Sequence, residues 1–256
     1  MRDPPARFDP DPSLSRAAME ALQCEIADAA VFDDDLPFDP ARVGETGPDA
    51  PLVAGVDQAF LTDREPERAV SAIVLWRGGE VVERTHAVLD VDLPYIPGLL
   101  SFREAGSILA AFRTLDRDPD VALFDGSGRI HFRQAGLATH VGAALDLPSV
   151  GVAKSLLCGT PRESVDELPA GARVPVEVRD GDDLDAPVGT VVGYAYQSRQ
   201  FPDSRRINPL YVSPGHRVSA GTAVALVARC GGDYKLPEPT RLADAYADEV
   251  KRELRE

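Results

Sequence analysis

Two spacings of hydrophobic residues alternate along the chain, and each predicts a different kind of element. Apolar residues three or four positions apart predict a helix at about residues 15–30, one face of which carries Ala18, Leu22, Ile26 and Ala29. Apolar runs of strand length follow at 52–60, 69–77 and 81–91. The Arg-Gly-Gly-Glu sequence at 77–80 predicts a hairpin turn between the last two runs.

The rest of the chain alternates between the same two patterns. Helical spacing returns at about 101–115, and a short, wholly apolar run at 121–124 is typical of a strand buried on both faces. The remaining expected elements are a helix at 135–145, strands at 149–153, 174–178 and 190–196, and helices at 220–229 and from 241 onward. This order predicts an α/β fold with a mixed sheet and helices on both of its sides.

Length and composition favour a single globular domain. The chain has 256 residues, 44% of them hydrophobic, which is enough for a sizeable core. Residues 1–16 are rich in Pro and Asp and are expected to be disordered, which leaves 17–256 as the domain. No apolar run has membrane-spanning length, and the first residues lack the apolar core of a secretory signal. The three cysteines, Cys24, Cys158 and Cys230, are odd in number and widely spaced, which indicates free thiols and a cytoplasmic protein.

The charge balance is strongly acidic. The net charge is −15, and the lysines are limited to Lys154, Lys235 and Lys251. Abundant Asp and Glu with almost no Lys is typical of a protein from an extreme halophile. In roughly molar salt the Debye length falls to about 3 Å, so an acidic surface would hardly repel a distant phosphate. The alternative is an acidic mesophilic protein that binds no polyanion. A maximum of activity in multi-molar KCl would support the first interpretation.

One acidic stretch at 179–187 has closely spaced carboxylates, as a calcium loop does. The other ligands and the spacing of such a loop are missing, so the stretch is interpreted as a solvated turn between two strands.

Three further acids lie where an acid needs an explanation. Asp57 falls inside the first strand, Asp125 ends the buried strand at 121–124, and Glu104 lies in the first turn of the helix at 101–115. Buried carboxylates are costly unless they meet a metal or hydrogen-bond donors, and strand ends of α/β sheets open onto ligand sites. Asp125 could equally start a turn, and Glu104 could stabilise a helix end. Their combination indicates a metal-dependent enzyme.

Basic and aromatic residues add to this picture. Lys154 closes a strand, where lysines often reach solvent but also suit a phosphate oxygen. His131 and His216 lie in Gly-containing loops, where a surface role competes with proton transfer or a phosphate contact. His86 and His140 lack such a context and are assigned structural roles. The stiff segment 94–98, Pro-Tyr-Ile-Pro-Gly, is either core packing or a wedge that separates stacked bases.

Six motifs together resemble the endonuclease V family. They are Pro-Tyr-Ile-Pro-Gly-Leu-Leu-Ser-Phe-Arg-Glu at 94–104, Asp-Gly-Ser-Gly-Arg-Ile-His at 125–131, Gly-Leu-Ala-Thr-His at 136–140, Pro-Ser-Val-Gly-Val-Ala-Lys at 148–154, Asn-Pro-Leu-Tyr-Val-Ser-Pro-Gly-His-Arg-Val-Ser at 208–219 and Tyr-Lys-Leu-Pro-Glu-Pro-Thr-Arg at 234–241. The resemblance covers roughly residues 15–247. It implies an RNase H-like fold with a central five-stranded mixed sheet flanked by helices. It also implies cleavage of DNA at deoxyinosine, at the second phosphodiester 3′ to the lesion, leaving a 3′-hydroxyl and a 5′-phosphate.

The resemblance also implies roles for individual residues. Asp57 and Asp125 would hold Mg²⁺, or Mn²⁺ in its place, and Glu104 would complete the acidic cluster directly or through water. Lys154 would contact phosphate, and His216 would join the active site. A wedge beside the flipped base would consist of Tyr95, Ile96, Pro97 and Gly98. The lesion would be recognised by Gly126, Ser127, Gly128 and His131.

Two departures and two alternatives remain open. Members of the family commonly carry His or Asn where this chain has Ser127, and Pro where it has Phe132, and both positions lie next to the lesion pocket that the resemblance implies. The stretch at 180–185 and the N-terminal extension are poorly covered by the resemblance. An inosine-specific endoribonuclease on the same fold is one alternative, because the sequence does not separate DNA from RNA. The other is a nucleic-acid-binding module without catalysis.

Overall fold

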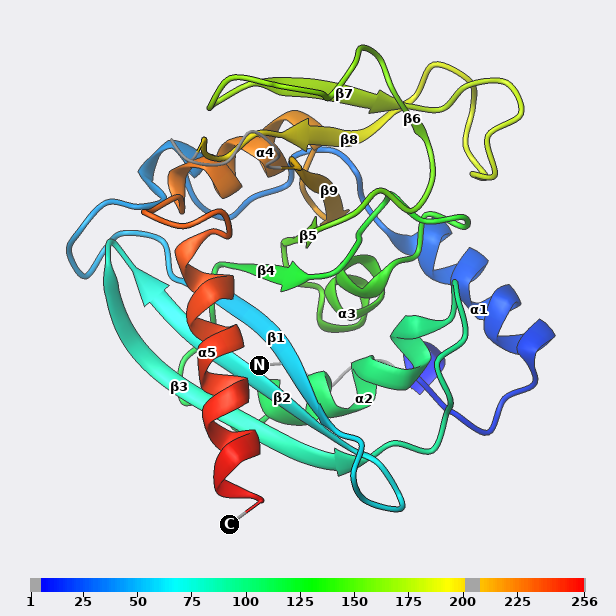
Figure 1. Ribbon diagram of the computed structural model, residues 1–256, viewed down its shortest axis with the longest axis vertical. Coiled ribbons are helices and arrows are strands. Elements are labelled where there is room, and N and C mark those ends of the chain that lie inside the picture. The colour runs from blue at the N-terminus through cyan, green and yellow to red at the C-terminus, as the bar shows by residue number, and fades with distance from the viewer. Residues whose placement is uncertain (1–5, 201–207, 256) are drawn as a thin grey trace.

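The computed structural model describes residues 6–200 and 208–255, and these build one twisted sheet covered by helices (Figure 1). Within them the sheet has nine strands in the order β3-β2-β1-β4-β5-β9-β8-β7-β6. The strands are β1 Val53–Leu61, β2 Arg68–Arg77, β3 Glu80–Asp90, β4 Val121–Asp125, β5 Ser149–Ala153, β6 Thr160–Pro161, β7 Arg173–Glu177, β8 Val191–Tyr196 and β9 Leu210–His216.

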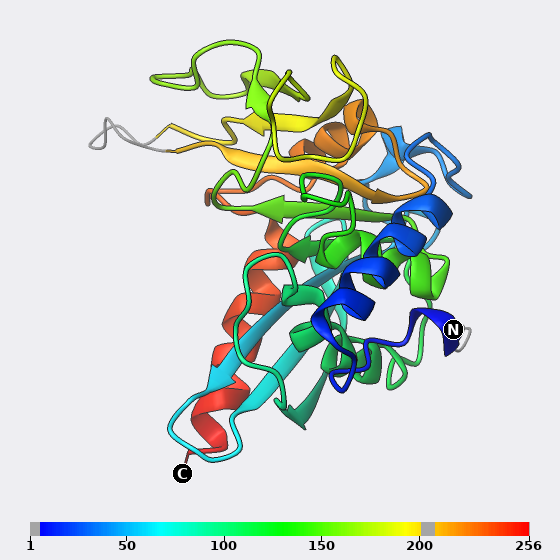
Figure 2. The same cartoon turned by 90° about the vertical axis from the view of Figure 1, so that its right-hand side faces the viewer.

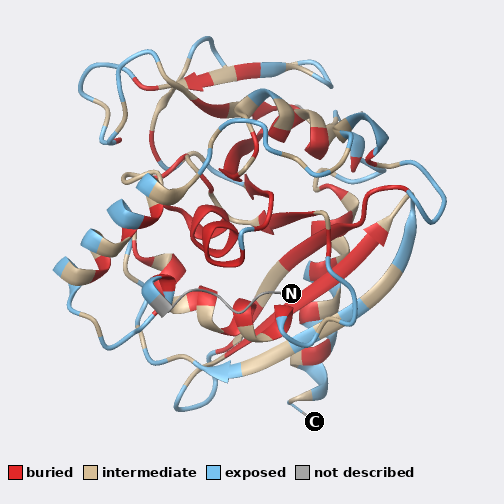
Figure 3. Cartoon of the chain, turned by 180° about the vertical axis from the view of Figure 1, so that it is seen from behind, coloured by how far each residue is buried: buried red, intermediate tan, exposed pale blue. Residues whose placement is uncertain are grey.

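Five of these strands form the predicted RNase H-like core. β1, β2 and β3 are antiparallel, and β4 and β5 run parallel to β1 in the order β3-β2-β1-β4-β5. The inner strands are buried on both faces because every residue from Val121 to Phe124 is apolar. β3 forms the outer edge and alternates between exposed and half-buried residues (Figure 3).

The expectation of a five-stranded sheet describes only this core. β9 pairs antiparallel with β5, and β8, β7 and β6 continue the same sheet. β9 was not predicted because Pro214 and Gly215 lie within it, and both residues normally signal a turn. The backbone accommodates Pro214 at a register shift between Ser149 and Val150 of β5.

Helices cover both faces of the sheet. α1 Arg16–Ala29, α2 Leu100–Phe112 and α3 Leu137–Leu145 share one core with β1, β2 and β4. α4 Ala220–Arg229 packs on the opposite face in a core with β5, β8 and β9, and α5 Glu238–Glu253 packs there against β1 and β2. The short helices η1 Ala6–Phe8 and η2 Pro40–Arg42 precede β1. This arrangement confirms the predicted α/β layers, and Figure 2 shows α1 beside the loop that leads into α2.

The described part of the N-terminal extension is folded against the domain. Phe8 is buried in the core of α1, α2 and α3, and its carbonyl bonds to His140 Nε2 at 2.9 Å. The expectation of disorder at 1–16 therefore does not extend to residues 6–16, and its remainder, 1–5, lies outside the described residues. Cys24, Cys158 and Cys230 are free thiols. In the described chain, every helix is too short or too polar to cross a membrane.

Candidate active site

Strand register brings the two predicted metal ligands together. Val56 of β1 is level with Phe124 of the parallel strand β4, so the next residues, Asp57 and Asp125, are neighbours. Two carboxylates this close repel each other unless a proton or a cation lies between them. The predicted pairing of these two acids is therefore a property of the fold.

The packing of α5 adds an acid that the sequence analysis missed. Gly55 of β1 permits this packing, because a Cβ there would lie 2.0 Å from the carbonyl carbon of Pro239 at the start of α5. The close approach brings Asp244 of α5 near enough to Asp57 to raise the pKa of the Asp57 carboxyl. The available signal was that Asp244 follows, three residues later, the matched motif that ends at Arg241.

Crowding of carboxyl groups raises the pKa of Asp57 to about 8. Burial is the largest cause, followed by the charge of Asp125, and contact with Asp244 adds to both. The backbone N–H of Gln58 donates to Asp57 Oδ1 at 2.7 Å and acts in the opposite direction. The Asp57 carboxyl is therefore largely protonated at neutral pH when no cation is near it.

Glu104 approaches the same region from α2. Its pKa is also raised to about 8, chiefly by burial and further by the charge of Asp125, whereas Arg103 acts to lower it. Glu104 lines a cavity of about 140 Å³ together with Asp57, Asp125, Gln58, Leu100 and Leu137. The three predicted acids therefore share one cavity.

The positively charged ammonium group of Lys154 lies beside these carboxyls. Its Nζ donates to Asp125 Oδ2 at 2.5 Å, and the two groups form an ion pair. Burial alone would lower the pKa of Lys154, but its hydrogen bond to Asp125 and the charges of Asp57 and Asp244 raise it. Lys154 therefore stays protonated, and its half-exposed side chain can meet an anion that enters the site.

The donor chemistry of the cluster fits a hard divalent cation. Its ligand atoms are carboxylate oxygens, which Mg²⁺ and Mn²⁺ prefer, and they come from elements fixed by the sheet. In the described residues no three His, Cys, Asp or Glu side chains converge closely enough to enclose a metal ion as they stand. The raised pKa values of Asp57 and Glu104 nevertheless mark carboxyls that a nearby positive charge would ionise.

A second, less polar cavity adjoins the acidic one. Its volume is about 110 Å³, and Leu100 and Leu137 line both cavities. The other lining residues are Tyr95, Pro97, Gly98, Ser101, Ser127, His131, Gly136 and Leu157. The structure thus brings Tyr95, Pro97 and Gly98 of the predicted wedge and Ser127 and His131 of the predicted lesion loop to one cavity next to the acids, whereas Ile96, Gly126 and Gly128 do not line it.

The wedge and the lesion loop are joined through His131. Its Nδ1 accepts from the Arg133 N–H at 3.3 Å, so Nε2 carries the hydrogen and donates to the Gly98 carbonyl at 3.1 Å. Burial lowers the pKa of His131 to about 4, and the nearby Arg133 also acts to lower it. His131 is therefore a neutral residue, and both of its ring nitrogens already have partners.

Ser101 is a second residue that the sequence analysis missed. It is buried at the N-terminal end of α2, and its hydroxyl has no hydrogen-bond partner among the described residues. Leu99, at the N-cap position, contributes no side-chain cap to this helix end. This end of α2 therefore faces the cavity with an unused hydroxyl, a feature that indicates a binding role.

His216 is not brought to either cavity. It pairs with Ser149 at the start of β5, whereas Asp125 and Lys154 lie at the other end of their strands. Its Nε2 bonds to Asp146 Oδ1 at 3.3 Å, and its Nδ1 accepts from the Val31 N–H at 3.2 Å. The structure thus gives His216 a bridging position between α1 and α3 and departs from the expected active-site position.

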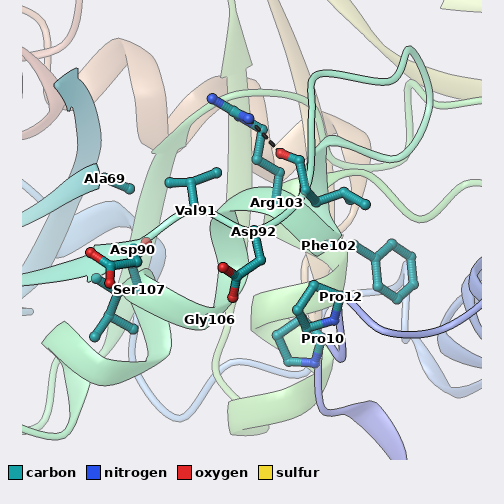
Figure 4. A pocket seen from close by; sticks show the side chains of 12 residues that line it. Pro10, Pro12, Ala69, Asp90, Val91, Asp92, Phe102, Arg103, Gly106 and Ser107 are labelled. Atoms are coloured by element: carbon teal, nitrogen blue, oxygen red, sulfur yellow. Dashed lines mark hydrogen bonds between the residues drawn. The ribbon is translucent and has the colours of Figure 1, made fainter. Parts of the chain in front are cut away.

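A further cavity lies on the far side of α2 (Figure 4). It measures about 180 Å³ and is lined by residues of the N-terminal segment, of β3 and of α2, among them Pro10, Asp92 and Arg103. Arg103 is engaged there, since its guanidinium donates to the Leu93 carbonyl (Figure 4) and pairs with Glu67. Arg103 therefore fixes Leu93, at the start of the loop that carries the predicted wedge residues 95–98 (the wedge loop).

Comparison with known proteins identifies the family of the chain. A family model described as Endonuclease V matches residues 41–245. An endonuclease V from Natronomonas pharaonis is 62% identical over 245 residues, which cover 96% of this chain and 95% of the relative.

Solved structures show the same architecture. The endonuclease V of Streptomyces avermitilis has 30% identity and a TM-score of 0.77, with 96% of each chain covered. The endonuclease V of Ciona intestinalis, solved in complex with a 24mer DNA that contains an inosine followed by a ribo-adenosine, has a TM-score of 0.74. That match covers 93% of this chain and 98% of the other at 23% identity, and it shows the fold alone.

Proposed function

The chain belongs to the endonuclease V family of phosphodiester-hydrolysing nucleases, and we propose that it is a metal-dependent repair enzyme that cuts DNA near deoxyinosine. The cut falls at the second phosphodiester 3′ to the lesion and leaves a 3′-hydroxyl and a 5′-phosphate. The observation that carries this proposal is the contact between the two cavities, which share Leu100 and Leu137. A base held in the neutral cavity places the phosphodiester bonds of its own strand beside the carboxyls of the acidic cavity. The Ciona complex with inosine-containing DNA, on the same fold, also supports this substrate.

Tyr95 is the natural wedge of this enzyme. Its side chain is 68% exposed at the tip of a loop that contains two prolines, so it can stack on bases without first unpacking. Pro97 and Gly98 continue the loop into the neutral cavity. Separation of the bases by the wedge favours a lesion because a deaminated base pairs less well and is less costly to turn out of the helix.

The neutral cavity suits an uncharged base with polar edges. Ser101 and Ser127 offer hydroxyls that can donate or accept, and Leu100, Leu137 and Leu157 supply apolar walls. Gly126 and Gly128 keep the lesion loop slim, since a Cβ on Gly128 would lie 2.3 Å from the Pro214 carbonyl oxygen. His131 holds the loop to the wedge, and as a neutral residue it repels no donor or acceptor of the base.

The acidic cavity carries the chemistry. Asp57 and Asp125, with Asp244, would hold Mg²⁺ or Mn²⁺, which supplies Lewis acidity and an activated water when bound. Lys154 neutralises charge on the phosphate that enters beside Asp125. Glu104, whose pKa is about 8, is suited to hold or release a proton near neutral pH at the same cavity. The free thiols of Cys24, Cys158 and Cys230 support a cytoplasmic location.

Cleavage of labelled single-inosine strands tests this function. DNA and RNA versions are incubated with Mg²⁺ or with EDTA, beside matched adenine strands, and the cut is mapped on a sequencing gel. The expected product is a DNA fragment that keeps the inosine and one further nucleotide, formed only with the metal. Cleavage of RNA alone would identify the ribonuclease alternative, and EDTA-insensitive binding without a cut would identify a binding module.

A further inference from the structure

The Gly98 carbonyl is the point where three separate segments meet. Gly98 ends the wedge loop, and its carbonyl accepts from His131 Nε2 of the lesion loop at 3.1 Å. It also accepts from Nε2 of Gln23, a residue of α1 that lies 75 positions earlier in the chain, at 2.7 Å. The Gln23 bond is the shorter of the two, and it is the one that ties the loop to a helix.

Gln23 is held in one orientation by both ends of its amide. The residue is 0% exposed, and its Oε1 accepts from Arg133 Nη1 at 3.2 Å while its Nε2 donates to Gly98. Arg133 is in turn fixed by an ion pair with Glu20, one helical turn before Gln23, at 3.0 Å. A buried amide with both ends satisfied is a rigid connection, because any movement leaves a buried polar atom unpaired.

α1 supports the wedge loop by packing as well. Leu93 and Ile96 of the loop pack in one small cluster with Met19 and Leu22 of α1. Arg103 holds the start of the loop through the Leu93 carbonyl (Figure 4), and Gln23 holds its end through Gly98. Both ends of the loop are therefore fixed, while Tyr95 at its tip projects into solvent.

We infer that Gln23 is a positioning residue for lesion recognition: it fixes the end of the wedge loop and, through the shared Gly98 carbonyl, the ring of His131. Gln23 touches neither cavity, so it acts through Gly98 and Arg133. α1 lies before residue 41, where the match to the family model begins. Through the bond from Gln23 to Gly98, this helix helps to position the residues that recognise the lesion. The inference rests on the proposed function, because it assigns Gln23 to the wedge and pocket of that function.

Two substitutions separate the bond to Gly98 from the bond to Arg133. Gln23→Met keeps the length of the side chain and removes both bonds. Gln23→Glu keeps the acceptor for Arg133 and, as a carboxylate, cannot donate to Gly98. Both variants lose the donor, so both should weaken engagement of the lesion by about tenfold, the size expected when a buried acceptor loses its partner.

The controls lie on the same helix. Ile26→Val, one turn further along the buried face, removes a methylene from a fully buried side chain and lowers stability without touching Gly98. Glu25→Gln changes an exposed charge on α1. The melting temperature of every variant is measured first, so that a loss of recognition can be compared with a matched loss of stability.

The measurement is fluorescence of 2-aminopurine placed beside the inosine, in EDTA so that no cutting occurs, followed by steady-state cleavage with Mg²⁺ at varied substrate concentration. We expect weaker unstacking and a raised KM with a nearly unchanged kcat for both Gln23 variants, and wild-type behaviour for both controls. Wild-type unstacking in Gln23→Glu would overturn the inference, because it would show that the Gly98 bond is dispensable. An equal loss in Ile26→Val would also overturn it. Failure of the wild-type enzyme to cut inosine strands would instead refute the proposed function.

Discussion

The acidic cavity and the neutral cavity adjoin each other but differ in the pKa shifts and hydrogen-bond partners of their polar side chains. In the acidic cavity Asp57, Asp125 and Glu104 lie together; Asp125 is paired with Lys154, and the other two acids have a pKa of about 8. In the neutral cavity the polar atoms of His131 are bonded to neighbours, and its pKa falls to about 4. The acidic cavity is suited to a cation, whereas the neutral cavity holds His131 in place and leaves the Ser101 hydroxyl without a partner among the described residues. The difference supports the proposal that cleavage needs a metal, whereas recognition depends on geometry built into the fold.

Removal of a carboxylate from the acidic cavity should have the largest effect. Asp125→Ala or Asp57→Ala takes away a proposed cation ligand at the point where the strands meet, and we expect cleavage to be abolished, a loss of several kcal/mol of transition-state stabilisation. Binding of inosine DNA should survive better, because the neutral cavity is intact. Single-turnover cleavage and a gel-shift assay measure the two effects.

The matched control for these variants is Asp248→Ala, an exposed acid on the same helix as Asp244. It should leave both activities near the wild-type level. Near-wild-type turnover in Asp125→Ala or Asp57→Ala would show that the two acids hold no catalytic cation. Equal loss of binding and cleavage would show that the acidic cavity is needed for DNA binding as well as for cleavage.

The two cavities should also respond to pH with opposite signs. The folded protein binds extra protons at Asp57 and Glu104 between about pH 4 and 8, because their pKa values are raised, so this contribution to stability falls as the pH rises through that range. His131 of the neutral cavity, with a pKa of about 4, binds fewer protons when folded, and so does His140, which is buried against Phe8 outside both cavities. Their contribution to stability falls as the pH drops from about 6.5 to 4.

Thermal melts without metal should therefore show greatest stability near pH 6, with a decline of roughly 5 °C or more by pH 8.5. Addition of Mg²⁺ should raise the melting temperature more at pH 8.5 than at pH 6, because ionised carboxylates then gain a partner. Asp57→Asn should flatten the alkaline decline and leave the acid decline in place. A decline that is unchanged in this variant would show that other groups cause it.

Only part of this comparison could be predicted from the sequence. Asp57 and Asp125 were identifiable because each interrupts or ends an apolar strand, and strand ends in α/β sheets host ligands. Asp244 was not, because its contact with Asp57 depends on how closely α5 packs at Gly55. His216 was expected in the site because its motif resembles that of the family. A motif does not tell which end of the neighbouring strand it will meet.

The spacing of apolar residues predicted the helices, but it did not show which polar residues they bury. The spacing of apolar residues predicted α1 within a residue or so, at 15–30 against Arg16–Ala29. Gln23 is a polar residue beside that apolar stripe. It is nevertheless fully buried, and its amide donates to a carbonyl 75 positions away. Long-range polar contacts of this kind leave no local signal in the sequence.

A smaller effect than loss of a carboxylate is expected at the wedge. Tyr95→Ala removes the exposed ring but none of the contacts at the roots of the loop, so the protein should keep its stability. Base–aromatic stacking is worth roughly 1–3 kcal/mol, so cleavage of inosine DNA should fall by about 5- to 150-fold at limiting substrate. Tyr95→Phe should restore it. An unchanged kcat/KM on inosine strands would remove Tyr95 from lesion engagement.

The smallest effect, and the sharpest test of the neutral cavity, is expected at Ser101. Its hydroxyl is buried and has no partner among the described residues, so the free protein should tolerate Ser101→Ala or become slightly more stable. If a base fills the cavity, the hydroxyl gains its missing hydrogen bond only in the complex, and the substitution should raise KM by about threefold to tenfold. Ser107→Ala is the contrasting control on the same helix, because its hydroxyl bonds to Ser71 at 2.7 Å and to Gln58 at 2.9 Å in the free protein. That variant should lose stability, and Ser101→Ala should lose affinity. If Ser101→Ala changes neither the melting temperature nor KM, the base does not use this hydroxyl, and recognition depends on the shape of the cavity and its backbone groups.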